Sequence, residues 1–144
     1  MKKIYFAAPM RGVRDALNES RAILKRLEEC GNLILTKHVV EDVLDTDKGL
    51  THQEVFARDV QLLDEADLLI AEVSYPSLGV GFEIAYTLLK GKPVVALVKK
   101  DRVEALSSLI RGITWSNFYL IEYSDLREAF EGLGKLGLVK GDCL

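Results

Sequence analysis

The sequence is poor in the residues that mark several specialised classes of protein. Its 144 residues include two cysteines and three prolines, and no apolar run approaches the roughly 20 residues that a membrane span requires. These scarcities exclude a disulfide scaffold, a collagen-like fibre and a transmembrane helix. The basic start of the chain is not followed by a long apolar stretch, so we expect no signal peptide.

Positive charge is also in short supply. The chain has 19 lysines and arginines against 22 aspartates and glutamates, which gives a formal net charge of −3. A domain that binds nucleic acid through its phosphate backbone is usually basic, and this sequence has neither a basic stripe nor an aromatic platform. We therefore expect no nucleic-acid partner and no membrane partner.

The motifs of common metal and cofactor sites are missing as well. Cys30 and Cys143 lack metal-type spacing, and we expect two free thiols in a reducing cytoplasm. His38 and His52 are 14 residues apart and belong to no cysteine-histidine cluster. The sequence contains no G-x-G-x-x-G, no G-x-x-x-x-G-K-[ST] and no G-x-S-x-G. We therefore expect no metal ion and no cofactor.

What is present is the composition of a soluble globular protein, with 49% hydrophobic and 28% charged residues. A chain of this length buries roughly 70% of its unfolded surface when it folds as one unit. We expect one domain over residues 1–144.

Short apolar runs alternate with amphipathic runs along the chain. The runs predict strands over 4–8, 33–35, 68–73, 93–98 and 118–121. They predict helices over about 13–31, 51–66, 82–90, 103–110 and 125–133. Thr51 and Glu54 fit a capping box that opens the second helix.

The third and fourth of these strands are almost continuously apolar, which is typical of strands buried on both faces of a parallel sheet. The alternation predicts an α/β fold, a doubly wound three-layer α/β/α sandwich around a five-stranded parallel sheet of the Rossmann or flavodoxin type. Such folds bind ligands at the carboxyl ends of the strands, near the point where the strand order reverses. Candidate site residues should therefore lie in the loops after the first four strands.

The loop after the third strand carries the pattern Ser77-x-Gly79-x-Gly81-x-Glu83. A serine hydroxyl and the backbone N–H groups of a glycine-rich helix start suit a phosphate group. We expect residues 74–81 to be loop and Glu83 to lie in the first turn of the next helix. Asp59, on the preceding helix, can face the same crevice, and two carboxylates in one cleft are the equipment for cleaving glycosidic bonds.

Two segments carry a family resemblance. Residues 4–12, I-Y-F-A-A-P-M-R-G, resemble the first strand and loop of the nucleoside 2-deoxyribosyltransferase superfamily. Residues 66–83 contain the core P-S-L-G-V-G-F-E and resemble the 2′-deoxynucleoside 5′-phosphate N-hydrolase branch of that superfamily. Segments 36–39 and 107–112 are similar to the same branch.

The resemblance implies catalytic roles for three residues. Glu83 corresponds to the nucleophile at C1′ of the deoxyribose. Asp59 corresponds to the aspartate associated with proton transfer to the leaving base, and Tyr5 to the tyrosine that orients the nucleophile. An acid above the base and a carboxylate beneath the sugar are what this cleavage requires.

The resemblance also implies substrate-binding roles for Ser77, Gly79, Gly81, Ser107, Arg11, Gly12 and His38. Ser77 and the glycines correspond to the 5′-phosphate loop, and His38 lies near the bound base. Ser107 corresponds to a serine that reaches the phosphate in the neighbouring subunit, so the expected active unit is a homodimer.

The leading hypothesis is a cytoplasmic N-glycosidase that hydrolyses 2′-deoxynucleoside 5′-monophosphates to free base and 2-deoxyribose 5-phosphate. One alternative is a nucleoside 2-deoxyribosyltransferase, which passes the sugar to a second base. Another is a hydrolase of ribonucleotides, such as a CMP-type N-glycosidase. The alternative outside enzymes is a non-catalytic nucleotide-binding module, because fold alone does not establish function.

Overall fold

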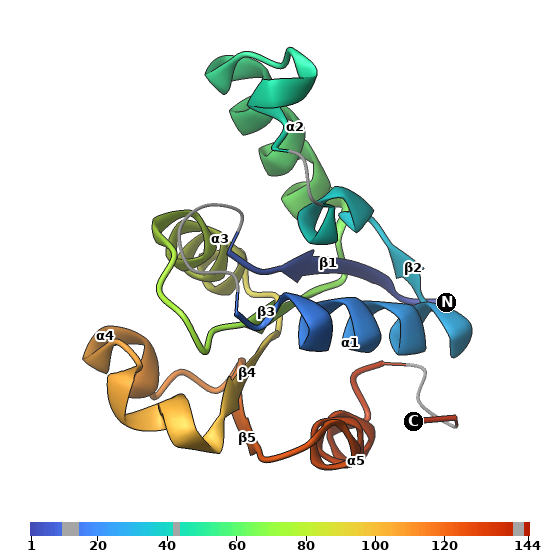
Figure 1. Cartoon of the computed structure of the whole chain (residues 1–144), viewed down its shortest axis with the longest axis vertical. Helices are drawn as coiled ribbons and strands as arrows, with labels where there is room; N and C mark the ends of the chain where they lie inside the picture. Colours follow the sequence, from blue (N-terminus) through green and yellow to red (C-terminus); the bar gives the residue numbers. More distant parts are fainter. Residues whose placement is uncertain (10–14, 42–43, 140–142) are drawn as a thin grey trace.

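The computed structural model describes residues 1–9, 15–41, 44–139 and 143–144 and is a three-layer α/β/α sandwich (Figure 1). Its strands are β1 (Lys3–Ala7), β2 (Leu33–Ile34), β3 (Leu68–Glu72), β4 (Val94–Lys99) and β5 (Phe118–Tyr123). Its α-helices are α1 (Leu17–Glu29), α2 (His52–Glu65), α3 (Leu78–Leu89), α4 (Ser108–Arg111) and α5 (Leu126–Leu136). Short 3₁₀ helices are η1 (Lys37–Val40), η2 (Thr46–Lys48) and η3 (Lys100–Ala105).

The five strands form one sheet in the order β2-β1-β3-β4-β5, and every neighbouring pair is parallel. The predicted fold class is thereby confirmed. The chain moves outward from β1 to β2 and then returns to the other side of β1, so the strand order reverses between β1 and β3. A crevice at the carboxyl ends of these two strands is where this fold binds ligands.

The sheet is covered by helices on both faces. On one face, Phe6 packs with Ile23 and Leu27 of α1 and Leu133 of α5. Figure 1 shows α1 and α5 on the same side of the sheet. On the other face, the apolar cluster includes Tyr5 and Ala7 of β1, Leu63 of α2, and Ile84 and Leu88 of α3. Because side chains alternate along a strand, Tyr5 points to the α2 and α3 side, where the site lies.

The capping box that was predicted for α2 is present. The Glu54 backbone N–H donates to Thr51 Oγ1 at 3.1 Å, and the Thr51 N–H donates to Glu54 Oε1 at 3.0 Å. The reciprocal bonds fix the start of the helix that carries Asp59.

The predicted start of α3 was wrong. The helix begins at Leu78 with Ser77 as its N-cap, so residues 78–81 are helical and Glu83 lies in the second turn rather than the first. The Ser77 hydroxyl accepts the Val80 backbone N–H at 3.3 Å, which starts the helix before the two glycines. The glycines concealed this start because their helix propensity is low.

The predicted helix over 103–110 is two shorter elements. The 3₁₀ helix η3 ends at Ala105, and α4 begins at Ser108 with Ser107 as its N-cap residue. Backbone at Leu106 and Ser107 has extended ψ values, which break the helix between the two elements.

The expectation of two free thiols was wrong. Cys30, at the end of α1, and Cys143, near the end of the chain, form a disulfide bond with their Cα atoms 5.6 Å apart. The two residues are 113 positions apart in sequence, and only the tertiary fold brings the C-terminal segment to α1.

Membrane-spanning helices are not found: over the residues that the structure describes, none of the helices is both long and apolar enough to cross a bilayer.

Candidate active site

A cavity of about 580 Å³ opens at the carboxyl ends of β1 and β3, between η1, α2 and α3. This is the reversal point of the strand order, as predicted. Six of the predicted site residues line it: Tyr5, His38, Asp59, Ser77, Gly79 and Glu83. Residues that lie up to 78 positions apart in the chain therefore share one cavity.

Tyr5 and Glu83 form a hydrogen-bonded pair in the wall of this cavity. Tyr5 is 2% exposed, and its hydroxyl donates to Glu83 Oε2. Tyr5 is buried on β1, an interior strand of the sheet, and its hydrogen bond orients a carboxylate that reaches the cavity from α3.

The Glu83 carboxyl has a raised pKa. Burial raises the pKa of Glu83 to about 7, with a further rise from the negative charge of Asp59, while the Tyr5 hydrogen bond and Arg58 act in the opposite direction. Burial raises the pKa of the Tyr5 hydroxyl as well, so Tyr5 remains a hydrogen-bond donor at neutral pH. A carboxylate that is poorly solvated near neutral pH suits nucleophilic chemistry.

Asp59 on α2 is held by the residue that precedes it. Arg58 Nε lies 3.0 Å from Asp59 Oδ1, and Arg58 Nη2 lies 2.9 Å from the same oxygen. Arg58 Nη2 also donates to Asp45 Oδ2 at 2.8 Å and lies 3.0 Å from His38 Nε2. One guanidinium thus joins α2 to η1 and to the segment before η2.

The local fold explains why His38 reaches this cluster. The Thr36 hydroxyl accepts the Phe6 backbone N–H at 2.9 Å and donates to the Phe6 carbonyl at 2.6 Å. These bonds dock η1 beside β1, so His38 lies 3.8 Å from Asp59 Oδ1. Burial lowers the pKa of His38, and Arg58 lowers it further.

The glycines of the phosphate-loop pattern leave open space. A Cβ atom at Gly81 would meet no heavy atom within 4 Å, and one at Gly79 would meet only the Ser77 hydroxyl, at 3.9 Å. Packing in the described protein therefore does not require glycine at either position. The open space at the start of α3 is wide enough for a ligand to approach the backbone closely.

Two predicted residues lie next to this cavity rather than in it. Ser107 and Gly81 line a neighbouring groove of about 750 Å³ between α3 and α4. Ser77 lines both spaces, so the groove and the cavity meet at the N-terminus of α3. Arg11 and Gly12, the other two predicted binding residues, lie outside the described residues.

The sequence reasoning missed four residues of the site: Asp45, Phe56, Arg58 and Phe82. Phe56 and Phe82 line the cavity with their ring centroids 6.2 Å apart, and 60% and 50% of their surfaces are exposed. Large apolar residues are usually buried, so the exposure of these two rings stands out in the structure, but the sequence alone showed no sign of it. The sequence did not single out Arg58 either, because a charged residue on an amphipathic helix is expected to face solvent.

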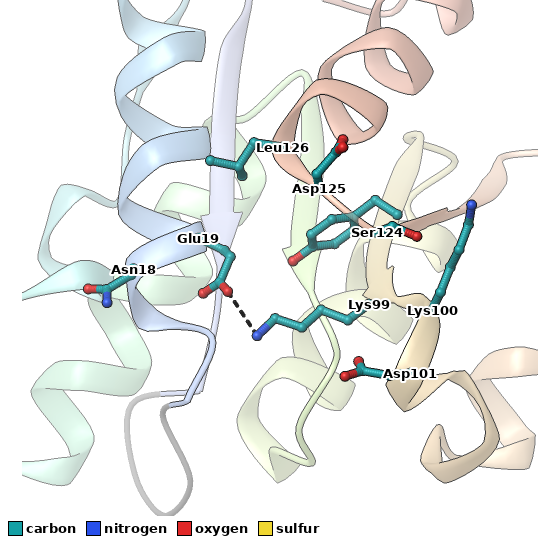
Figure 2. A pocket seen from close by; sticks show the side chains of 9 residues that line it. Asn18, Glu19, Lys99, Lys100, Asp101, Ser124, Asp125 and Leu126 are labelled. Atoms are coloured by element: carbon teal, nitrogen blue, oxygen red, sulfur yellow. Dashed lines mark ion pairs between the residues drawn. The ribbon is translucent and has the colours of Figure 1, made fainter.

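A third cavity, of about 640 Å³, lies between the start of α1 and the ends of β4 and β5 (Figure 2). Both lysines that line it are ion-paired: Lys99 Nζ lies 2.9 Å from Glu19 Oε1, and Lys100 Nζ lies 2.8 Å from Glu128 Oε2. None of the predicted site residues lines it. Among the described residues, no group of three or more histidines, cysteines or carboxylates is placed to hold a metal ion.

Comparison with known proteins places this chain in a family. The model of the nucleoside 2-deoxyribosyltransferase family matches residues 4–128. A Thermofilum pendens protein named "Putative 2'-deoxynucleoside 5'-phosphate N-hydrolase 1" is 61% identical over 134 residues, which are 93% of this chain and 94% of that protein. The zebrafish (Danio rerio) 5-hydroxymethyl-dUMP N-hydrolase is 35% identical over 92% of this chain and 98% of its own length.

Among solved structures, a CMP N-glycosidase from Clostridium botulinum superposes with a TM-score of 0.70 at 24% identity. The match covers 94% of this chain and 99% of that protein, and it supports the fold. The expectation of an enzyme that hydrolyses N-glycosyl bonds agrees with the names of the sequence relatives. With a family model matched from the first strand to the last helix, and a relative 61% identical over nearly the whole chain, this chain belongs to the nucleoside 2-deoxyribosyltransferase family.

Proposed function

We propose that this protein hydrolyses the N-glycosidic bond of 2′-deoxynucleoside 5′-monophosphates, with Glu83 as the nucleophile. The observation that carries the proposal is the Tyr5–Glu83 pair, which puts an oriented carboxylate with a raised pKa in the same cavity as Asp59. The names of the relatives support a nucleotide as substrate.

In the first proposed step, a Glu83 carboxylate oxygen bonds to C1′ of the deoxyribose. The bond from C1′ to the base breaks, its electron pair stays on the base nitrogen, and Asp59 delivers the proton that the base needs. In the second step, water attacks C1′ and gives a proton to Asp59, and the ester bond to Glu83 breaks with its electron pair returning to the carboxylate. This is the retaining route of glycoside hydrolysis.

The lining of the cavity supports a proposed binding site for each end of the substrate. The Ser77 hydroxyl and the N-terminus of α3 suit the 5′-phosphate, and Gly79 leaves room for it. Phe56 and Phe82 offer apolar ring surface for the base, near His38. Binding energy from the phosphate then supports catalysis at the remote C1′.

We propose that the active unit is a homodimer. Ser107 is exposed and lines the groove beside the Glu83 cavity, not the cavity itself, so a neighbouring subunit would bring its own Ser107 to the phosphate. The groove is bordered by Leu78, Leu109 and Trp115, which are 98%, 82% and 53% exposed. Apolar exposure of this kind favours a protein interface. We further propose that the protein acts on a small-molecule deoxynucleotide in the cytoplasm and binds neither nucleic acid nor a membrane.

The test of the proposed function is a chromatographic assay of base release. Each deoxynucleoside monophosphate is compared with its ribonucleotide and its unphosphorylated nucleoside, with and without an added free base. Release from deoxynucleotides without acceptor is expected. Product that forms only with an acceptor base would make the protein a transferase, and release from ribonucleotides alone would move the substrate to that class. If the protein binds nucleotides tightly but releases no base from any of them, it is a non-catalytic binding module.

A further inference from the structure

Arg58 is the shared partner of three cavity residues but does not line the cavity. Its side chain contacts Asp59 Oδ1, Asp45 Oδ2 and His38 Nε2, all within 3.0 Å. Asp45, His38 and Asp59 all line the cavity around Glu83. Arg58 is therefore placed to act on a ligand through other residues and not by contact.

The contact with His38 determines where the ring carries its proton. An arginine side chain has five N–H donors, no acceptor, and stays charged. His38 Nε2 lies 3.0 Å from Arg58 Nη2, so this ring nitrogen must be the acceptor and must be unprotonated. The imidazole is then neutral and carries its proton on Nδ1.

The contacts with Asp59 select between its two carboxylate oxygens. Arg58 Nε and Nη2 and the 3.8 Å approach of His38 all involve Oδ1. In the described parts of the chain, no hydrogen bond is made to Oδ2. Because Arg58 binds Oδ1, Oδ2 is the oxygen of Asp59 that we expect to exchange a proton.

We propose that Arg58 is a positioning residue that holds His38 as the neutral Nδ1–H tautomer and presents Oδ2 of Asp59 for proton transfer. The statement about His38 is independent of the reaction, whereas the statement about Asp59 rests on the proposed function.

The charges around His38 support the same assignment. Burial is the main influence that lowers the pKa of His38, followed by the positive charge of Arg58. Asp45, Asp59 and Glu41 act in the opposite direction, and the pKa is lowered on balance. A neutral ring at pH 7 follows, despite three carboxylates nearby.

The first arm of the test is NMR on the full chain, with two-bond ¹H–¹⁵N correlation of the histidine rings at pH 8. His52→Gln identifies the His38 signals. In the wild type, we expect an unprotonated Nε2 and a protonated Nδ1. In Arg58→Met, the fixed tautomer should be lost, and the pKa of His38 should rise because a neighbouring positive charge is gone. Arg127→Met, which removes an exposed cation paired with Glu131, should change neither.

The second arm is kinetic. Arg58→Met should lower kcat for deoxynucleotide hydrolysis by about 10- to 100-fold, the usual cost of losing an outer-shell orienting group, with KM changed by only a few fold. Arg58→Lys should recover part of kcat, and thermal unfolding of each variant separates this effect from a loss of stability.

The outcomes keep the two proposals apart. A protonated Nε2 in the wild type, or an unchanged tautomer in Arg58→Met, would overturn the inference whatever the enzyme hydrolyses. Wild-type kcat in Arg58→Met would overturn the role toward Asp59 while leaving the proposed function standing. Lack of wild-type turnover would remove the proposed function, and the NMR arm would still decide the tautomer. If Arg58→Met does not fold, the wild-type spectrum alone carries the decision.

Discussion

The part of the chain that the structure describes contains two tyrosine–glutamate pairs, and they differ in burial and in hydrogen bonding. In both pairs, Tyr5–Glu83 and Tyr123–Glu72, the hydroxyl donates to Oε2 of the glutamate. Glu72 is fully buried at the end of β3, and its Oε1 accepts the Ser74 backbone N–H at 2.6 Å. Glu83 is only partly buried and, within the described chain, Tyr5 is the one residue that donates to its carboxylate.

The difference teaches that a tyrosine beside a glutamate does not by itself mark a nucleophile. Burial is the main influence that raises the pKa of Glu72, just as it is for Glu83. Donors occupy both oxygens of Glu72, whereas Glu83 keeps Oε1 available in a cavity. We infer that Glu72 anchors the turn after β3, because Ser74 in turn accepts the Lys99 backbone N–H at 2.9 Å.

The largest expected contrast is between Glu83→Gln and Glu72→Gln. Glu83→Gln should lower kcat by at least about 10³-fold, because an amide is not a nucleophile at C1′. Glu72→Gln should keep kcat within a few fold of the wild type. Base release from a deoxynucleotide monophosphate measures both, and equal losses in the two variants would erase the distinction between the pairs.

Stability gives Glu83→Gln a second readout. A glutamate whose folded pKa is about 7 rather than 4.5 binds its proton more tightly in the folded state, so stability is present at low pH and falls as the pH rises from about 4.5 to 7. Glu83→Gln removes this loss and should be about 1 to 3 kcal/mol more stable than the wild type at pH 8. Urea unfolding of both proteins at pH 5 and pH 8 measures this difference in the free energy of unfolding. A variant less stable than the wild type at pH 8 would contradict the prediction.

The next contrast concerns the two tyrosines and pH. The Tyr5 hydrogen bond lowers the pKa of Glu83, so Tyr5→Phe should raise that pKa further. The acidic limb of kcat/KM, expected near pH 7 in the wild type, should move to higher pH, and activity at pH 7 should fall by about 10-fold or more. Tyr123→Phe should leave the limb in place. A limb that does not move in Tyr5→Phe would show that Glu83 is not the group that titrates.

The smallest expected effect is that of Tyr123→Phe on stability. Removing the hydroxyl leaves one oxygen of a fully buried carboxyl without its donor, which costs about 1–3 kcal/mol. Chemical unfolding near neutral pH measures the loss, with kcat unchanged. A loss of activity without destabilisation would instead assign Tyr123 a role in the reaction, and the two tyrosine–glutamate pairs would no longer differ in function.

Much of the fold was predictable because its signals are local. Apolar runs predicted the five strands, and Thr51 and Glu54 predicted the start of α2 through bonds that span three residues. The site location followed from topology, since parallel strands end at one edge. Tyr5, Asp59 and Glu83 were predicted through the family resemblance, and the structure brings them into one cavity.

What escaped prediction depends on contacts between distant segments. Arg58 looks like an ordinary charged helix residue until Asp45 and His38 fold against it. Glu72, in a strand of otherwise apolar residues, gives no sign that Tyr123, 51 positions later, supplies its donor. Cys30 and Cys143 could not be paired without knowing where the C-terminal segment packs.

The disulfide closes residues 30–143 into a covalent ring and leaves the N-terminal segment, residues 1–29, as an arm outside it. The ring runs from Cys30 to Cys143 and contains Asp59 and Glu83, whereas β1 and Tyr5 lie on the arm. Yet β1 is a central strand, flanked by β2 and β3 of the ring. A ring of more than 100 residues strongly restricts the unfolded chain, with a stabilisation of about 4–5 kcal/mol in the chain-entropy model. The bond therefore limits the disorder of the unfolded segment that carries Asp59 and Glu83. Tyr5 lies outside that segment and is held by the neighbouring strands and by its hydrogen bond to Glu83.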